Sequence, residues 1–331
     1  MSEIRTRRNL VIMFLAFSAV YVIWGSTYLA IKYAIETMPS FLMAGFRFLF
    51  AGGLLYVWAR LSPGYERPTL RQWRTSLIVG TLLLAIGNGG VVVAEEYIPS
   101  SLAALLVATM PFWIVLLGWI FMNTGRPNLK VVLGLLLGFA GVAFLITGRG
   151  EASGSGDAGT GYYFGVAAII VGTFGWAIGS LYGSRADTAR SPILAAGMQM
   201  LTGGTVLILI GTVAGEWARF DLTVVSTASW LSFVYLVIFG AVIGYTAYSW
   251  LLKNVSPAAI STYAYVNPAI AVLLGWAVAG ESMTGQMLIG AFVIVLSVAL
   301  ITSNNKRGIK TTEPKLEIIK GGHSEQPGYS T

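Results

Sequence analysis

The sequence lacks several residue types on which soluble enzymes depend. It contains no cysteine, which excludes disulfides and thiolate chemistry. Only 11% of its 331 residues are charged, against roughly 25% in a soluble domain, while 56% are hydrophobic. Its one histidine, His323, lies in a polar carboxyl-terminal stretch. This composition predicts a membrane protein, and it excludes a histidine proton relay inside the membrane.

Apolar runs close to the 20 residues that cross a bilayer occur throughout the chain. Forty glycines accompany them, which suits helices whose backbones approach closely in lipid. We therefore expect an all-α membrane protein with ten transmembrane helices. The predicted spans lie near residues 10–34, 40–59, 75–95, 101–122, 129–147, 162–183, 193–214, 228–251, 257–279 and 286–302.

The two halves of the chain repeat one another, with five apolar runs in each. The tetrapeptide LLGW follows a proline by five residues in both halves, at Pro111 and at Pro268. A unit with an odd number of crossings enters the bilayer inverted when duplicated, so the pattern predicts two inverted five-helix repeats with a substrate site between them. We expect repeats at 1–150 and 151–303 and a disordered tail at 304–331. Three pairs share an offset of 152: Trp24 and Trp176, Gly45 and Gly197, Gly52 and Gly204.

Basic residues set the expected orientation. With a cytoplasmic amino terminus, 17 of the 21 lysines and arginines fall in cytoplasmic segments, which predicts that both termini are cytoplasmic. The net charge of +7 then faces anionic lipid headgroups, and we expect no nucleic-acid partner. The expected location is the bacterial inner membrane, as a multi-pass protein. The expected partners are the lipid bilayer and a small-molecule substrate. The simplest assembly is a monomer, although the sequence does not determine oligomeric state.

Carboxylates are absent from the middle of every predicted span. Only Glu95 and Glu96 approach the membrane, at the outer end of the third span, and Glu281 is placed at or beyond the external surface. A membrane-embedded enzyme would need an acidic metal cluster, a catalytic dyad or a histidine. We therefore expect no enzyme, no catalytic residue, no metal and no cofactor.

Three segments resemble the drug/metabolite transporter superfamily, in its bacterial EamA-domain branch. They are VYVIWGSTYLAIKYAIETMPSFLMAGFRFLFAG, AEEYIPSSLAALLVATMPFWIVLLGW and VNPAIAVLLGWAVAGESMTGQMLIGAFVIV, and the resemblance extends from about residue 10 to 302. It implies ten helices in two inverted repeats, with a central cavity lined by helices 1, 3, 4, 6, 8 and 9. It also implies a metabolite exporter, often of amino acids or related compounds.

Two charged residues are the main candidates for recognition or coupling. Glu95 lies two helical turns beyond Asn88 on the same face, so it either binds a substrate ammonium, carries a coupling proton, or marks the end of the helix. The pattern A-E-x-x-x-P-S, which resembles one EamA subgroup, favours Glu95 over Glu96. Arg47 lies within the second span, where it either pairs with Glu95 or a substrate carboxylate, or is a structural arginine.

Aromatic and polar side chains at helical spacing provide the remaining cavity candidates. Tyr21, Trp24, Tyr28 and Lys32 form one stripe on the first helix, which suits either a cavity wall with cation–π contacts or ordinary packing with an interfacial lysine. Prolines within the fourth and ninth helices should kink them, as hinges or as static bends. The other candidates, which could orient a zwitterion without a fixed charge, are Thr109, Trp113, Thr173, Trp176, Ser180, Tyr245, Tyr248, Tyr263 and Asn267, and the hinge candidates are Pro111 and Pro268.

These features together predict a secondary transporter. We expect it to export small organic metabolites, amino acids or related compounds, through a central cavity by alternating access. The alternatives left open by the sequence are an exporter of toxic cationic drugs, a passive facilitator and a lipid flippase. Each of these also tolerates a cavity with few charges.

Overall fold

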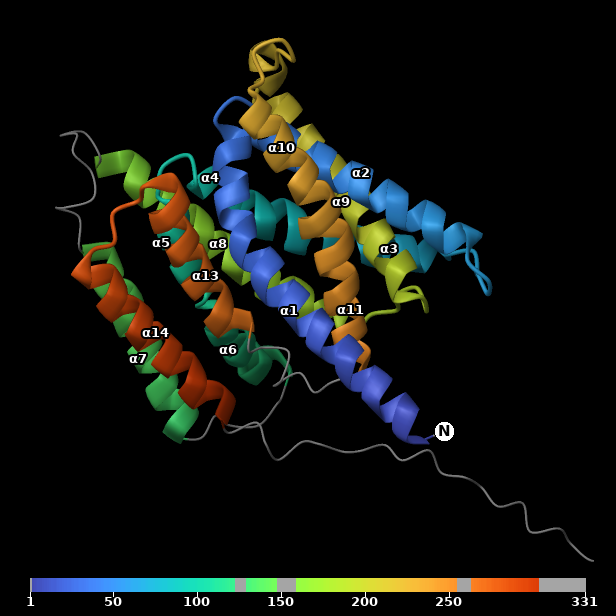
Figure 1. The fold of residues 1–331 in the computed structure, drawn as a ribbon, viewed down its shortest axis with the longest axis horizontal. Helices are drawn as coiled ribbons and strands as arrows, with labels where there is room; N and C mark the ends of the chain where they lie inside the picture. The colour runs from blue at the N-terminus through green and yellow to red at the C-terminus, as the bar shows by residue number, and fades with distance from the viewer. Residues whose placement is uncertain (1, 123–128, 148–158, 255–262, 304–331) are drawn as a thin grey trace, which may run out of the picture.

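The computed structural model describes residues 2–122, 129–147, 159–254 and 263–303, and every regular element in these ranges is a helix (Figure 1). Two elements, η1 and η3, are π-helical, and η2 is a 3₁₀ turn. In chain order the elements are α1 (Ser2–Ile35), α2 (Ser40–Leu61), α3 (Leu70–Gly80), η1 (Thr81–Asn88), α4 (Gly89–Ala94), α5 (Ser100–Val107), α6 (Met110–Met122), α7 (Leu129–Thr147), α8 (Gly159–Gly183), α9 (Pro192–Val213), η2 (Glu216–Arg219), α10 (Thr227–Tyr235), η3 (Leu236–Ile243), α11 (Gly244–Asn254), α13 (Tyr263–Ala279) and α14 (Gly285–Ser303).

Long apolar helices dominate this architecture, because a chain in lipid must satisfy its backbone hydrogen bonds internally. Within the described ranges, seven helical segments are long and apolar enough to cross a membrane, and three more are apolar but shorter. The all-α membrane class is thus confirmed. The predicted tail at 304–331, and the part of the ninth predicted span before residue 263, lie outside the described residues. The seven are Val11–Ile35, Ser40–Leu61, Leu70–Ala94, Ser100–Phe121, Gly159–Gly183, Pro192–Val213 and Thr227–Tyr248, and the three are Leu129–Leu145, Val266–Ala279 and Gly285–Ser297.

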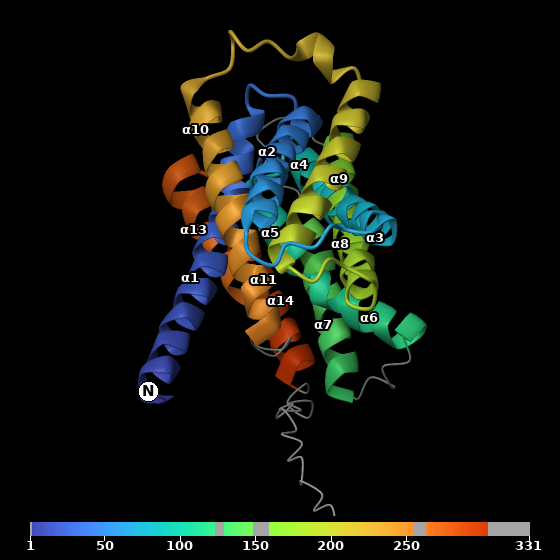
Figure 2. The same cartoon turned by 90° about the vertical axis from the view of Figure 1, so that its right-hand side faces the viewer.

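Helices α2 and α9 lie side by side, and small residues set their approach (Figure 2). A Cβ on Gly204 would lie 2.9 Å from the carbonyl oxygen of Gly45, and one on Gly197 would lie 3.1 Å from that of Gly52. The four glycines that match at an offset of 152 therefore meet crosswise: Gly45 contacts Gly204, the repeat counterpart of Gly52, and Gly52 contacts Gly197, the repeat counterpart of Gly45. Such close backbone contact is the means by which membrane helices associate.

Each of two long spans contains a π-helical segment in its middle. η1 joins α3 to α4, and η3 joins α10 to α11. A π-segment adds a residue to the helical turn and often occurs at a functional site. Nothing in the sequence of these spans predicts a π-segment. The two π-segments bring Gly87 and Asn88 from one span, and Gly240 and Ala241 from the other, to a common cavity.

The two candidate hinge prolines differ in their structural setting. The predicted fourth span is interrupted, since α5 ends at Val107 and α6 begins at Met110, one residue before Pro111. The helix therefore breaks where proline can no longer supply a backbone donor to the preceding turn. Pro268 lies inside α13, which continues through it from Tyr263 to Ala279.

The free backbone N–H groups at helix starts find hydrogen-bond acceptors in two ways. Thr69 forms a capping box with Gln72 at α3, a device that the local sequence provides. By contrast, α2 and α5 follow prolines that provide no side-chain cap. Their first amides donate to carboxylates far away in the chain, Glu216 for α2 and Glu281 for α5. These two glutamates therefore connect the second half of the chain to the first.

Candidate functional site

A central cavity lies where helices from both halves meet. The space measures about 930 Å³ when the open solvent at its mouth is counted with it. Residues of the six helices that the family resemblance implied contribute to it, and α2 adds Arg47 and Phe48. The wall consists of Trp24, Thr27, Tyr28, Ile31, Arg47, Phe48, Leu84, Gly87, Asn88, Val91, Ala104, Val107, Ala108, Met110, Gly172, Thr173, Trp176, Gly240, Ala241, Tyr245, Tyr263, Asn267 and Pro268.

The structure brings most of the sequence candidates to this wall and leaves others outside it. Thr109 is buried and donates to the carbonyl of Leu106, and Trp113 packs edge-on against Phe139 and Phe174. The candidates that line the cavity are Trp24, Tyr28, Arg47, Asn88, Thr173, Trp176, Tyr245, Tyr263, Asn267 and Pro268, and those that do not are Tyr21, Lys32, Glu95, Thr109, Pro111, Trp113, Ser180 and Tyr248.

Four aromatic rings form a cluster at one side of the cavity. The ring centroid of Trp24 lies 6.4 Å from that of Tyr245, 5.1 Å from that of Tyr248 and 5.5 Å from that of Tyr263. The indole nitrogen of Trp24 donates a hydrogen bond of 3.2 Å to the carbonyl of Gly240 in η3. Tyr248 therefore supports the wall without lining it. A tilted, partly edge-on arrangement of this kind gives a firm apolar surface with polar edges.

Asn267 and Asn88 add neutral polar groups. With its amide nitrogen directed at the backbone, Asn267 donates to the carbonyls of Tyr21 and Tyr263 at 3.2 and 3.3 Å. It thereby joins α1 to α13 near Pro268. The side-chain oxygen of Asn88 is buried and has no hydrogen-bond partner, so it remains an available acceptor in the wall.

Arg47 is the one charged side chain among the described residues of the cavity wall. The residue is 4% exposed, and its guanidinium carbon lies 4.8 Å from the ring centroid of Phe48. Its Nε and Nη1 atoms are buried without a hydrogen-bond partner. A charge inside a membrane protein is costly, and such residues usually serve a function.

Glu95 lies behind the wall. It is 7% exposed, and it is near enough to Tyr28 and Arg47 to interact with both electrostatically. No ion pair within 4.0 Å joins Glu95 to Arg47 in the described chain. Glu95 is not among the residues that line the cavity.

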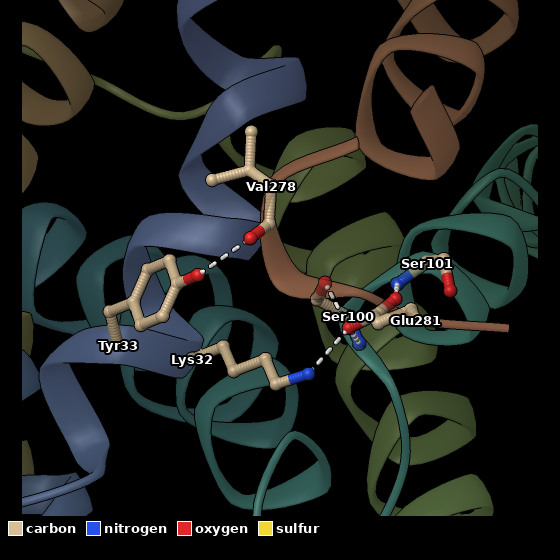
Figure 3. A network of polar contacts seen from close by, with 6 residues as sticks. All are labelled: Lys32, Tyr33, Ser100, Ser101, Val278 and Glu281. Carbon is tan, nitrogen blue, oxygen red and sulfur yellow. Dashed lines mark hydrogen bonds and ion pairs between the residues drawn. The ribbon is translucent and has the colours of Figure 1, made fainter. Parts of the chain in front are cut away.

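Lys32, in the last turn of α1, forms a polar cluster with Glu281 (Figure 3). Lys32 Nζ lies 2.8 Å from Glu281 Oε1, and this carboxylate also accepts from the backbone amides of Ser100 and Ser101 and from the Ser100 hydroxyl. Burial alone would raise the pKa of Glu281, but these donors lower it to about 2. The side chain of Glu281, which follows the ninth predicted span, is only 5% exposed.

Comparison with known proteins explains this arrangement. The model of the EamA-like transporter family matches residues 10–147 and 163–303. The chain belongs to the EamA-like transporter family. The inner membrane transporter YedA of Escherichia coli K12 is 40% identical over 298 residues, which cover 89% of this chain and 92% of YedA. The transporter YvbV of Bacillus subtilis 168 is 26% identical over 303 residues, covering 91% of this chain and 93% of YvbV.

A solved crystal structure also has the fold of this EamA-like transporter. It matches with a TM-score of 0.59 and 22% identity, covering 89% of this chain and 98% of that one. The family assignment confirms the resemblance found in the sequence, and a family of transporters fits the expectation of a non-enzyme. Among the described residues of this EamA-like transporter, no group of three or more His, Cys, Asp or Glu could hold a metal ion.

Sequence reasoning missed several features of the EamA-like transporter's site. The carbonyl of Gly240 accepts from Trp24, and Gly87 and Gly172 let helix backbones form part of the wall. The only signal for these positions was the high glycine content. The Lys32–Glu281 pair joins residues 249 positions apart, and no local pattern indicates such a contact.

Proposed function

We propose that this chain is a secondary transporter that exports small organic metabolites, amino acids or related compounds, across the bacterial inner membrane by alternating access. The observation that carries the proposal is the central cavity, which combines one buried cation, aromatic rings and neutral polar groups. Its inner-membrane location follows from the likeness to YedA. In this proposal the chain forms ten spans in two inverted five-helix repeats, with both termini in the cytoplasm.

Two structural relationships support the inverted repeat. The glycines matched at an offset of 152 pair crosswise between α2 and α9, as a two-fold axis in the membrane plane would require. The π-segments η1 and η3 occupy the middle of one span in each half and face the same cavity. The family model also matches each half separately. A transporter built this way rocks its halves about a fixed central site.

The absence of native cysteine provides a direct test. Thr27 lines the cavity, so Thr27→Cys places a single thiol there, whereas Thr205→Cys on the exposed face of α9 is the matched control. In proteoliposomes loaded with unlabelled amino acids, we expect saturable counterflow of labelled amino acid. A membrane-impermeant thiol reagent should block Thr27→Cys and leave Thr205→Cys active.

The side of the membrane from which the thiol reagent reaches Thr27→Cys distinguishes a carrier from a passive pathway. Under alternating access, the reagent should modify Thr27→Cys from either face of the membrane, at rates that change in opposite directions when substrate is supplied on one side. Flux that does not saturate, with no counterflow, would indicate a facilitator. A panel of toxic cations in the same vesicles tests the drug-export alternative, and lipid scrambling without solute flux would indicate a flippase.

A further inference from the structure

The guanidinium of Arg47 has hydrogen-bond donors that the protein leaves unused. It projects from α2 into the cavity wall, where a Cβ built on Gly240 would lie 3.2 Å from Nη2. The small residue at 240 therefore leaves room for the guanidinium. Nε and Nη1 are buried without a partner, although the five N–H groups of arginine form a fork suited to a carboxylate.

Charge balance around Arg47 is also incomplete. Glu95 is near enough to interact electrostatically, but the two side chains form no ion pair within 4.0 Å in the described chain. The ring of Phe48 offers a cation–π contact, which lacks the directionality of a hydrogen bond. The charge of Arg47 is therefore only partly compensated. An anion that enters the cavity and accepts hydrogen bonds from its free N–H groups would complete the compensation.

The remainder of the cavity wall indicates the chemistry of the rest of the solute that carries this anionic group. Trp24, Tyr28, Trp176, Tyr245 and Tyr263 contribute aromatic surface, and the described wall holds no carboxylate. A solute with two or more negative charges would leave all but one of them uncompensated there, because Arg47 is the one cation of the described wall. A cationic drug would meet Arg47 as a like charge. The surroundings therefore suit one carboxylate attached to an apolar or aromatic body.

We infer that Arg47 binds the carboxylate of the transported solute, and that the substrates are small monocarboxylates with an apolar body. Arg47 then determines specificity: it selects acids, including amino acids, against amides and amines of the same shape. This inference rests on the proposed function because it names the substrate class. It is nevertheless a statement about binding, and it can be measured without transport.

Matched ligands give the first test, on the purified wild-type protein in detergent. The aromatic series is phenylalanine, 3-phenylpropanoate, phenylalaninamide and 2-phenylethylamine, and the aliphatic series is leucine, 4-methylpentanoate, leucinamide and isoamylamine. Binding is followed by thermal stabilisation and by intrinsic tryptophan fluorescence, to which Trp24 and Trp176 in the cavity wall contribute. In at least one series we expect the two acids to bind tenfold to a hundredfold more tightly than the amide and the amine.

Variants give the second test. Arg47→Gln should remove the preference for acids, and Arg47→Lys should keep a weakened preference because it retains the charge without the fork. Arg74→Gln, on the exposed face of α3, removes a positive charge elsewhere and should behave as wild type. The wild-type series requires no variant, so a folding defect at position 47 cannot hide the answer.

Three results would overturn the inference: amides and amines binding as tightly as acids, no acid binding in either series, or unchanged acid binding by folded Arg47→Gln. Acids that bind as expected but show no counterflow would leave the carboxylate site standing and contradict the proposed transport. The two hypotheses therefore fail separately.

Discussion

Lys32 and Glu281 join α1 to the turn that precedes α14, through a contact of 2.8 Å between Nζ and Oε1. The same carboxylate accepts from two backbone amides at the start of α5. One buried side chain thus holds three separate segments together at one end of the bundle. Its removal should loosen that end without touching the cavity wall, to which neither residue contributes.

Glu281→Gln should lower stability. The amide keeps the shape and one acceptor, but it loses the charge that pairs with Lys32 and caps α5, a loss on the order of 1–3 kcal/mol. The matched control is Glu66→Gln, because Glu66 pairs with Arg190 at 2.9 Å in an ion pair whose side chains are 63% and 84% exposed. Such a pair contributes little. Thermal unfolding in detergent should show a clear loss for the first variant only; equal effects would contradict this role for Glu281.

Acid should destabilise the wild-type protein through the same residue. The pKa of Glu281 is lowered to about 2 from an ordinary 4.5, so the folded state binds fewer protons than the unfolded state between these values. Its stabilising contribution is complete above about pH 5 and is lost as pH falls toward 2, on the order of 2 kcal/mol after allowance for solvent screening. Denaturant titrations from pH 6 to pH 3 should show a smaller decline for Glu281→Gln. Parallel declines would contradict the prediction.

Two adjacent glycines on α2 should respond differently to alanine. A Cβ on Gly52 would lie 2.8 Å from the backbone nitrogen of Leu201, so Gly52→Ala must push α9 away, at about 1–3 kcal/mol. A Cβ on Gly53 would meet nothing within 4 Å, so Gly53→Ala should be neutral or stabilising by up to about 1 kcal/mol. Melting temperatures of the two variants provide the measurement. A harmless Gly52→Ala would mean that the α2–α9 contact is looser than described.

Glu95→Gln should separate coupling from binding. Glu95 lies behind the wall rather than in it, so we expect slower driven export while protein abundance and substrate counterflow remain largely intact. Export driven by a pH gradient and counterflow at equal pH are compared in the same vesicles. An equal loss of both would assign Glu95 to substrate binding or folding, and no change in either would make it a simple helix end.

Local sequence pattern was a good guide where the structure depends on local periodicity. Apolar runs located the apolar helices, and Trp24 and Tyr28 of the predicted stripe line the cavity. The constant offset of 152 singled out glycines that prove to pair at a helix crossing. For Lys32 the stripe left two interpretations open, a cavity wall and an interfacial lysine; the structure pairs its ammonium with Glu281, a contact that no local pattern predicts.

The features that escaped prediction all depend on distant parts of the chain. A π-segment such as η1 contains ordinary apolar residues, and packing against other helices determines whether the extra residue is accommodated. The break between α5 and α6 precedes Pro111, whereas a proline in a continuous apolar run predicts only a bend. Nothing in the local sequence around Glu281 indicates that its side chain is buried. Its burial depends on amides 180 and 181 residues away.

The cap that Glu216 places on α2 has a consequence for biosynthesis. The amides of Phe41 and Leu42 donate to a carboxylate that is synthesised 175 and 174 residues later. At roughly 5–20 residues per second, the start of α2 waits about 9 to 35 s for its acceptor. During that interval its free N–H groups must find water or lipid headgroups, which keeps this end of the nascent helix at the membrane surface. A ribosome that stalls before codon 216 would therefore leave an inserted but uncapped half, a natural substrate for membrane quality control.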